Sequence, residues 1–276
     1  MTDWMMNWFK DIFAYDVFDK ISIILKLDPS RGKFTVAWNA IESVYTNVMV
    51  PIALGLMIIW FLVALMEKSA SEQVTLEQIF MLFVKLIAAK FIIDNGFQIF
   101  TQLWSLGISL IDEVGDAFID PNNPVAFDYK DLWKDLTGVT WGDKLPIMTS
   151  LGLLCQLLVP WIASKVMIGC VYFICYSRLF EMMVRMLATP VAVSDFITEG
   201  LHGAGWRYIK NFLAICLQGM IIVAIGQLYP LIMSGVLSNP GNKFWEVILM
   251  FLALSFSAVA LMFKSLSLSK ELVGTS

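Results

Sequence analysis

The sequence predicts an all-α, polytopic integral membrane protein with about five transmembrane helices and an N-terminal amphipathic helix in the membrane interface. Two observations carry this prediction. The mean hydropathy of the 276-residue chain is +0.74, and charged residues make up 15% of it, whereas they are about a quarter of a soluble domain. The chain also contains several runs that reach the roughly 20 apolar residues needed to cross a bilayer. The lipid bilayer is therefore the solvent that suits this composition.

The N-terminal segment, residues 1–40, does not read as a cleaved secretory signal, because acidic residues recur in it and no uninterrupted apolar stretch is present. Aromatic and aliphatic residues follow helical spacing along one face: Trp4, Trp8, Ile12, Tyr15 and Phe18. Such a helix either lies in the interface with its aromatic rings at headgroup depth or packs on the protein's own surface. Both interpretations stay open.

The first two membrane spans are expected within residues 41–111. The first covers residues 44–66, with Pro51 near its start, where a helix tolerates proline best. The second apolar stretch, residues 76–111, is too long for one untilted crossing, and residues 94–96 (Asp-Asn-Gly) interrupt it with turn-forming types. Either one long helix crosses and projects beyond the bilayer, or two short segments form a re-entrant hairpin.

The rest of the chain alternates polar and apolar segments. Residues 112–145 form an acidic loop that we expect outside the cell. Residues 146–176 contain the third span, interrupted by Pro160. Residues 212–263 contain the fourth and fifth spans, and the short turn between them predicts an antiparallel hairpin. Residues 264–276 form a polar tail on the cytoplasmic side.

Residues 177–211, here called the elbow, join the third and fourth spans. Short loops rich in Lys and Arg face the cytoplasm. The rule is applied here to the following cations: Lys68, Arg178, Arg185, Arg207, Lys210, Lys264 and Lys270. The rule predicts a cytoplasmic elbow, five crossings, an external N-terminus and an internal C-terminus. Three cations before the first span favour six crossings instead: Lys26, Arg31 and Lys33.

The elbow is the candidate docking site for cytoplasmic partners. Arg178, Glu181 and Arg185 are spaced to share one helix face, and Thr189-Pro190 is expected to end that helix. A glycine cluster then lets the chain turn, and two cations approach the lipid phosphates. The complete candidate set is Arg178, Glu181, Arg185, Pro190, Gly200, Gly203, Gly205, Arg207 and Lys210.

Nothing in the sequence predicts an enzyme, a cofactor or a metal site. The cysteines all lie in apolar runs, and His202 is the single histidine, so a zinc site with histidine is excluded. Hydrolase, metalloprotease and nucleotide-loop motifs are missing as well.

Polar residues inside the apolar stretches are the informative ones, because a charge in hydrocarbon needs shelter. Lys90 and Asp94 are one turn apart and can pair with each other. Alternatively, Lys85, Lys90 and Lys165 line a water-filled path for an anionic polymer or help to close an oligomer, or they extend to the headgroups. In the fourth span, Gln218, Gly219 and Gly226 are candidates for helix packing.

The elbow and its surroundings, residues 170–226, resemble the TrbL-type polytopic membrane component of conjugation and type IV secretion machines, closest to versions in Gram-positive conjugative elements. The resemblance rests on RLFEMMVRMLATP, the glycine cluster, the Tyr208-Ile209-Lys210 helix start and Gln218-Gly219. It implies a ring-forming homo-oligomer in the cytoplasmic membrane, in contact with lipids, with other secretion subunits and with ATPases. It also implies single-stranded DNA with bound relaxase as the transported substrate.

Two hypotheses from other classes remain beside this channel-scaffold hypothesis. Interrupted helices near the middle of the bilayer are how secondary transporters build sites for small molecules or ions, although no internal repeat is visible and no small-molecule ligand is predicted. A passive membrane anchor for an envelope complex is the other.

Overall fold

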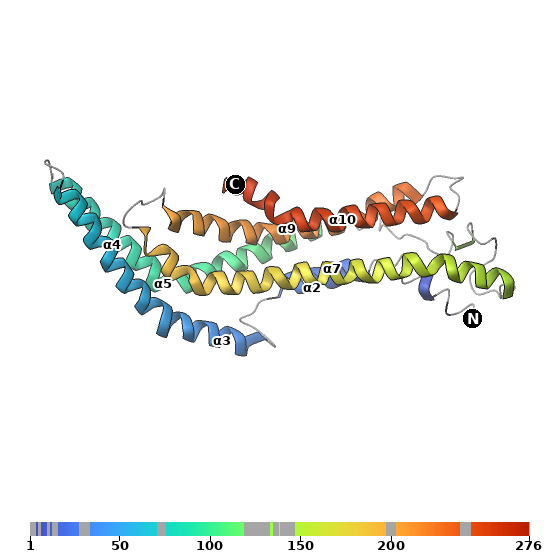
Figure 1. Ribbon diagram of the computed structural model, residues 1–276, viewed down its shortest axis with the longest axis horizontal. Helices are drawn as coiled ribbons and strands as arrows, with labels where there is room; N and C mark the ends of the chain where they lie inside the picture. Colours follow the sequence, from blue (N-terminus) through green and yellow to red (C-terminus); the bar gives the residue numbers. More distant parts are fainter. Residues whose placement is uncertain are drawn as a thin grey trace. The chain divides into compact units, whose positions relative to one another are not determined.

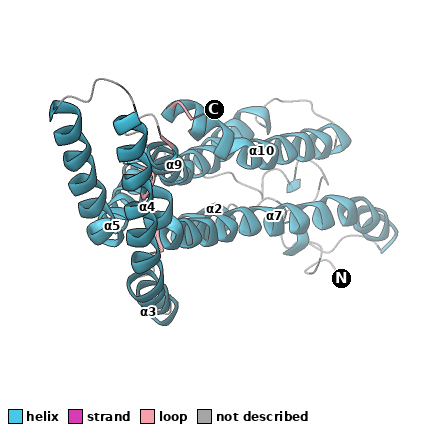
Figure 2. Cartoon of the chain, turned by 60° about the vertical axis from the view of Figure 1, so that its left-hand side comes forward, coloured by secondary structure: helices cyan, strands magenta, loops and turns pink. Residues whose placement is uncertain are grey.

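In the computed structural model, nearly all of the described residues lie in helices (Figures 1 and 2). The described residues are 4, 7–9, 12, 16–27, 34–70, 76–118, 133–134, 138, 147–196, 203–237 and 244–275. The helices are α2 (Asp16–Leu25), α3 (Thr35–Val44), α4 (Val50–Ala70), α5 (Leu76–Ala117), α7 (Ile147–Val193), α9 (Ala204–Leu237) and α10 (Phe244–Val273).

Four helical segments within the described ranges are long and apolar enough to cross a membrane: Thr35–Ala70, Cys155–Val193, Ala204–Val236 and Trp245–Val273. Helix α5, at 42 residues, is longer still but more polar. The prediction of an all-α polytopic membrane protein is confirmed, and four such segments together with α5 agree with about five transmembrane helices.

Helix α5 is continuous through residues 94–96, so the structure has one long helix here and no re-entrant hairpin. The turn-forming residues are accommodated within the helix. Asn95 Nδ2 donates to the carbonyl oxygen of Phe91 at 3.0 Å, one turn back, and Gly96 is buried where another helix approaches closely.

Helix α7 corrects two expectations, because it continues through Pro160 and also past Thr189-Pro190 to Val193. A proline removes one intrahelical hydrogen bond, and tight packing of the last turn keeps it helical. The helix ends where Ser194 donates from its main-chain N–H to the Pro190 oxygen at 3.1 Å and from Oγ to the Val191 oxygen at 2.7 Å.

The other spans also begin or end beyond their predicted limits. Helix α9 starts at Ala204 rather than residue 212, and α10 runs through the polar tail to Val273. The first span starts at Thr35, and a π-helical turn, Tyr45–Met49, links α3 to α4. Pro51 lacks the N–H that an α-helical turn would use, and such a wider turn is a common way to absorb that loss.

Part of the N-terminal aromatic face packs on the protein itself. Trp8 stacks on Trp161 with ring centroids 4.7 Å apart, and Phe9, which is buried, contacts Trp133 edge to face. Of the two interpretations left open for this segment, these contacts favour packing on the protein. Most of residues 1–15 lie outside the described residues.

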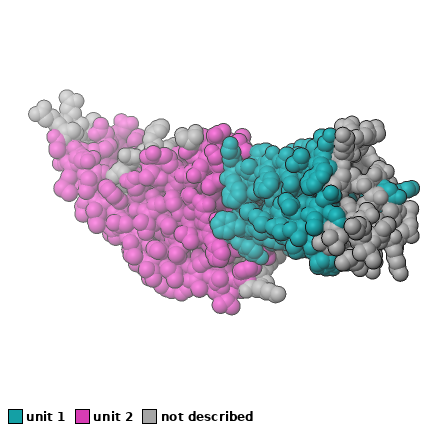
Figure 3. Space-filling view, turned by 45° about the vertical axis from the view of Figure 1, so that its right-hand side comes forward, with its two compact units in different colours: residues 1–25, 111–176, 220–265 teal, residues 26–110, 177–219, 266–276 magenta. Residues whose placement is uncertain are grey.

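The chain divides into two compact units, which Figure 3 colours separately. Unit 1 consists of Met1–Leu25, Ile111–Tyr176 and Met220–Ser265. Its core draws on α2, α5, α7, α9 and α10: Ile21, Leu25, Ile111, Val171, Ile174, Cys175, Ile222, Val223 and Met262. Tyr229 and Ser255 add a buried hydroxyl–hydroxyl hydrogen bond of 2.7 Å between α9 and α10.

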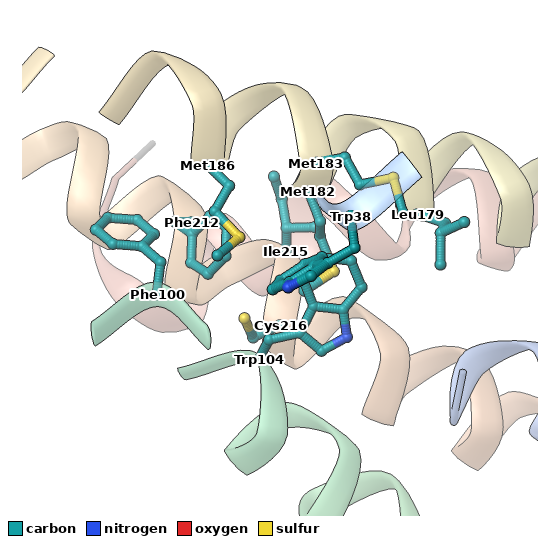
Figure 4. Close-up of a cluster of buried hydrophobic side chains, with 10 residues drawn as sticks. All are labelled: Trp38, Phe100, Trp104, Leu179, Met182, Met183, Met186, Phe212, Ile215 and Cys216. Carbon is teal, nitrogen blue, oxygen red and sulfur yellow. The ribbon is translucent and has the colours of Figure 1, made fainter. Parts of the chain in front are cut away.

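Unit 2 consists of Lys26–Leu110, Ser177–Gly219 and Leu266–Ser276, and it has two cores. The first, shown in Figure 4, joins α3, α5, α7 and α9 through Trp38, Phe100, Trp104, Leu179, Met182, Met183, Met186, Phe212, Ile215 and Cys216. The second joins α4 to α5 through Ala53, Met57, Ala64, Leu82, Ala89 and Ile93.

Candidate functional site

The two helices of the elbow are held together by a buried arginine. Arg178 on α7 is 5% exposed, and its Nε donates to the main-chain oxygen of Ile215 on α9 at 3.0 Å. One terminal nitrogen of the same guanidinium lies 3.4 Å from the oxygen of Cys216. Both carbonyl groups already sit in a helix, so the arginine uses their second lone pairs. The Arg178 side chain therefore links α7 directly to the middle of α9.

One turn further along α7, the other predicted charges form an ion pair within the helix. Arg185 contacts Glu181 Oε1 through both Nε, at 3.0 Å, and a terminal nitrogen, at 2.8 Å. Both side chains are partly exposed. Tyr208 on α9 donates its hydroxyl to the main-chain oxygen of Arg185, which adds a second bond between the elbow helices.

The close approach of α7 explains why residue 205, at the start of α9, is a glycine. A Cβ atom at this position would lie 3.0 Å from the Ala192 oxygen and 3.3 Å from the Val193 Cα. Any larger residue would push the first turn of α9 away from the last turn of α7. The glycine thus permits the tight return of the chain that the sequence predicts for the elbow.

Helix α5 seats against α9 at a second close approach. A Cβ atom on Gly107 would lie 3.1 Å from Cys216 Cβ and 3.4 Å from the Cys216 oxygen. This is the same carbonyl group that Arg178 approaches from α7. Three helices of unit 2 therefore meet around one peptide group.

Tyr45 forms the corresponding contact between the π-helical turn and α5. It is 2% exposed, and its hydroxyl donates to the main-chain oxygen of Ile93 at 3.1 Å. A Cβ atom on Gly96 would collide with that hydroxyl.

The predicted interior charges are not gathered into one basic surface. Lys85 is half-buried, and Lys90 and Asp94 are exposed on α5, with no ion pair joining these two described residues. Lys85 and Lys90 are five residues apart and so point in different directions around the helix. Lys165 belongs to unit 1, where its Nζ lies 5.6 Å from the centroid of the Trp161 ring.

The remaining candidates are placed as follows. Pro190, Gly203, Gln218, Gly219 and Gly226 are buried in their helices or helix ends. Arg207 is exposed and Lys210 is half-buried. Gly200 lies outside the described residues.

Several residues that build the site make contacts that the sequence did not predict. Tyr45, Gly96, Gly107 and Trp38 form or permit helix contacts across more than 40 positions of sequence, and no local pattern reveals such pairs. The buried position of Arg178 also differs from an exposed charge on a docking face. Within the described ranges, no group of three or more His, Cys, Asp or Glu could hold a metal ion.

Comparison with known proteins identifies one family. The family model described as TrbL/VirB6 plasmid conjugal transfer like protein matches residues 21–190. The match includes the first part of the elbow and ends before its glycine cluster. No curated protein and no solved structure matches the chain.

Proposed function

Because the chain belongs to the TrbL/VirB6 plasmid conjugal transfer-like family, it is a membrane component of a conjugal transfer apparatus, and we propose that it acts there as an oligomeric scaffold or channel subunit in the cytoplasmic membrane. The observation that carries the proposal is the family match, which extends from α2 into the last turn of α7 and covers the first candidate membrane span, α5 and nearly all of the second candidate span. The family is a structural component of conjugation machines rather than a known enzyme family.

The transported substrate in this proposal is single-stranded DNA with its bound relaxase. Other membrane subunits and ATPases of the secretion machine are its partners. Lys85, within the apolar part of α5, supports an oligomer, because a charged group at membrane depth is sheltered by neighbouring protein or by water rather than by lipid.

The elbow is the proposed contact for cytoplasmic partners. Its two described helices are held together by hydrogen bonds from Arg178 and Tyr208 and by the close approach at Gly205. Among the described residues of the elbow, Arg207 is exposed, and four charged side chains are partly exposed: Glu181, Arg185, Asp195 and Lys210. A surface whose backbone is already ordered loses little conformational entropy when a partner binds.

We further propose that the elbow and the Trp38 end of the first span lie on the same, cytoplasmic side. An external N-terminus, as expected from the sequence, would put Trp38 and the elbow on opposite faces of the membrane. Trp38 instead belongs to the same core as Met182 and Met183 of α7 (Figure 4). A cytoplasmic position of this end also suits Lys26, Arg31 and Lys33.

Deletion of the coding sequence from a conjugative element tests the proposal. We expect transfer to be lost, to return when the chain is supplied in trans, and transferring DNA to crosslink to the complex that contains it. A matched control supplies the chain with Gly55→Ala, a position with open space around it. Normal transfer without the chain would refute the proposal, and uptake of a small solute by the purified chain would favour a transporter.

A further inference from the structure

We infer that α4 and the first part of α5 form a transmembrane helical hairpin whose lipid-facing band ends at Asp94, and that the polar face of α5 beyond Asp94 contacts water on the side of the elbow. This divides a helix that the sequence predicts as one apolar stretch. It stands on the exposed side chains of unit 2 alone and does not depend on the proposed function.

Helix α4 defines the band most clearly. Along the π-helical turn and α4, the accessible side chains change from polar to apolar and back to polar: Thr46 and Asn47 in the turn are exposed at one end and Glu67 at the other. Between them, large apolar side chains are exposed around the helix: Val48, Ile52, Ile58, Ile59, Trp60, Leu62 and Met66. Residues 48–66 extend roughly 28 Å at 1.5 Å per residue, close to the ~30 Å of hydrocarbon in a bilayer.

The first part of α5 repeats the pattern in the opposite chain direction. Glu77 and Gln78 are exposed at its start. Phe80, Ile87 and Phe91 follow, with exposed fractions of 71%, 68% and 61%. Such exposure of large apolar groups suits hydrocarbon and not water.

The bands on the two helices are held in register. Tyr45, two residues before Asn47, bonds to the oxygen of Ile93, next to Asp94, so the two polar boundaries coincide. Further along, Ala53, Met57 and Ala64 pack with Leu82, Ala89 and Ile93. Small side chains at this contact let the helices approach closely, as is typical of helix pairs in membranes.

Beyond Asp94 the same face of α5 becomes polar. Asp94, Gln98, Gln102, Ser105 and Ser109 are all exposed, and their spacing of three or four residues places them along one side of the helix. Ser105 and Ser109 donate to carbonyl oxygens of their own helix at 2.8 and 3.1 Å. The charged Asp94 and the exposed glutamine amides require water or protein in place of lipid.

The polar boundary at Asp94 can be compared with the positions of the elbow and of the two lysines of α5. Phe196, at the end of the α7 side of the elbow, packs against the α4–α5 core, and Gly96 lies near the Thr189 methyl group, 3.8 Å from its would-be Cβ. The elbow is thus level with the Asp94 end of the hairpin. Lys90 is one turn inside the boundary, within reach of the headgroups, whereas Lys85 lies deep in the band.

Cysteine accessibility tests the boundary. The full chain with Cys155→Ser and Cys170→Ser, produced in donor-cell membranes, receives one cysteine at a time: Ile87→Cys, Phe91→Cys, Gln98→Cys, Gln102→Cys or Arg207→Cys. A membrane-impermeant maleimide is applied to intact cells and to inverted vesicles, and denatured samples give the total. Ser105→Cys and Ser109→Cys provide milder variants should a glutamine position disturb folding.

We expect the cysteines at 98, 102 and 207 to react from one and the same side, and those at 87 and 91 to stay protected from both sides until denaturation. Labelling at 91 equal to that at 98, protection throughout positions 98–109, or reaction of 98 and 207 from opposite sides would each overturn the inference. Transfer frequencies of the same strains report on the proposed function separately, so each can fail without the other.

Discussion

Arg178 and Ile215, 37 positions apart, are joined by a hydrogen bond of 3.0 Å from a buried guanidinium to a helical carbonyl oxygen. The bond connects the last span before the elbow to the first span after it. Since the side chain is buried, its charge is compatible with folding only while these acceptors are in place.

Replacing Arg178 by leucine should destabilise the protein. The bond to Ile215, at 3.0 Å, is the shorter of the two, and one hydrogen bond to a charged group contributes about 1.5–3 kcal/mol. We therefore expect a loss of ~2 kcal/mol and a clear fall in the melting temperature in detergent. Arg207→Leu, at an exposed position of the same elbow, is the control. Equal melting temperatures for the two variants would contradict a structural role of the Arg178 bonds.

Gly96 and Tyr45 should show compensating effects. Gly96→Ala adds a Cβ atom where the Tyr45 hydroxyl lies, and it should lower the melting temperature. Tyr45→Phe removes that hydroxyl and its bond to Ile93, at a cost of about 1 kcal/mol. The double variant should melt above Gly96→Ala alone, because the collision is gone.

Thermal unfolding of the four proteins of this double-mutant cycle gives the coupling energy. Gly55→Ala, which meets nothing within 4 Å, is the matched control for adding a methyl group to a helix. Additive effects at positions 45 and 96 would show that the two residues do not meet.

The Glu181–Arg185 pair should matter for docking more than for stability. Exchanging the two residues keeps an ion pair on the same helix face, and such pairs on helices contribute only ~0.3–0.5 kcal/mol. We expect an unchanged melting temperature with reduced transfer. A loss of ~1.4 kcal/mol in partner binding would lower affinity about tenfold. Full transfer by the exchanged variant would remove these two charges from the docking surface.

Lys85 should be the interior lysine that transfer depends on. A lysine at the middle of a bilayer costs ~2.5–3.5 kcal/mol on insertion scales, so it is retained where a neighbouring subunit or water shelters it. Lys85→Leu should insert normally but reduce transfer and complex assembly. Lys90→Leu, near the headgroups, is the control and should have little effect. Transfer at the wild-type level by the Lys85→Leu variant would show that transfer does not depend on Lys85.

The sequence alone predicts that the chain lies in a membrane and where most of its helices are, but it does not predict which residues of different helices touch. Apolar runs predicted the all-α membrane class, because a bilayer leaves few choices for a backbone. The helix breaks predicted at residues 94–96 and at Pro190 were wrong. Close packing at Gly96 and at Gly205 keeps both stretches helical, although their local sequence favours an interruption. Arg178 was singled out correctly as a site residue, yet its burial depends on Ile215, which lies on another helix.

The most direct test of the account is the mass of the complex extracted from donor membranes during transfer, measured by native mass spectrometry in a mild detergent or in nanodiscs. If several copies shelter Lys85 of α5, the particle will contain two or more copies of the 31.1 kDa chain, and Lys85→Leu will shift it toward assemblies with fewer copies. A 31.1 kDa monomer that alone restores transfer to a deletion strain would contradict the account.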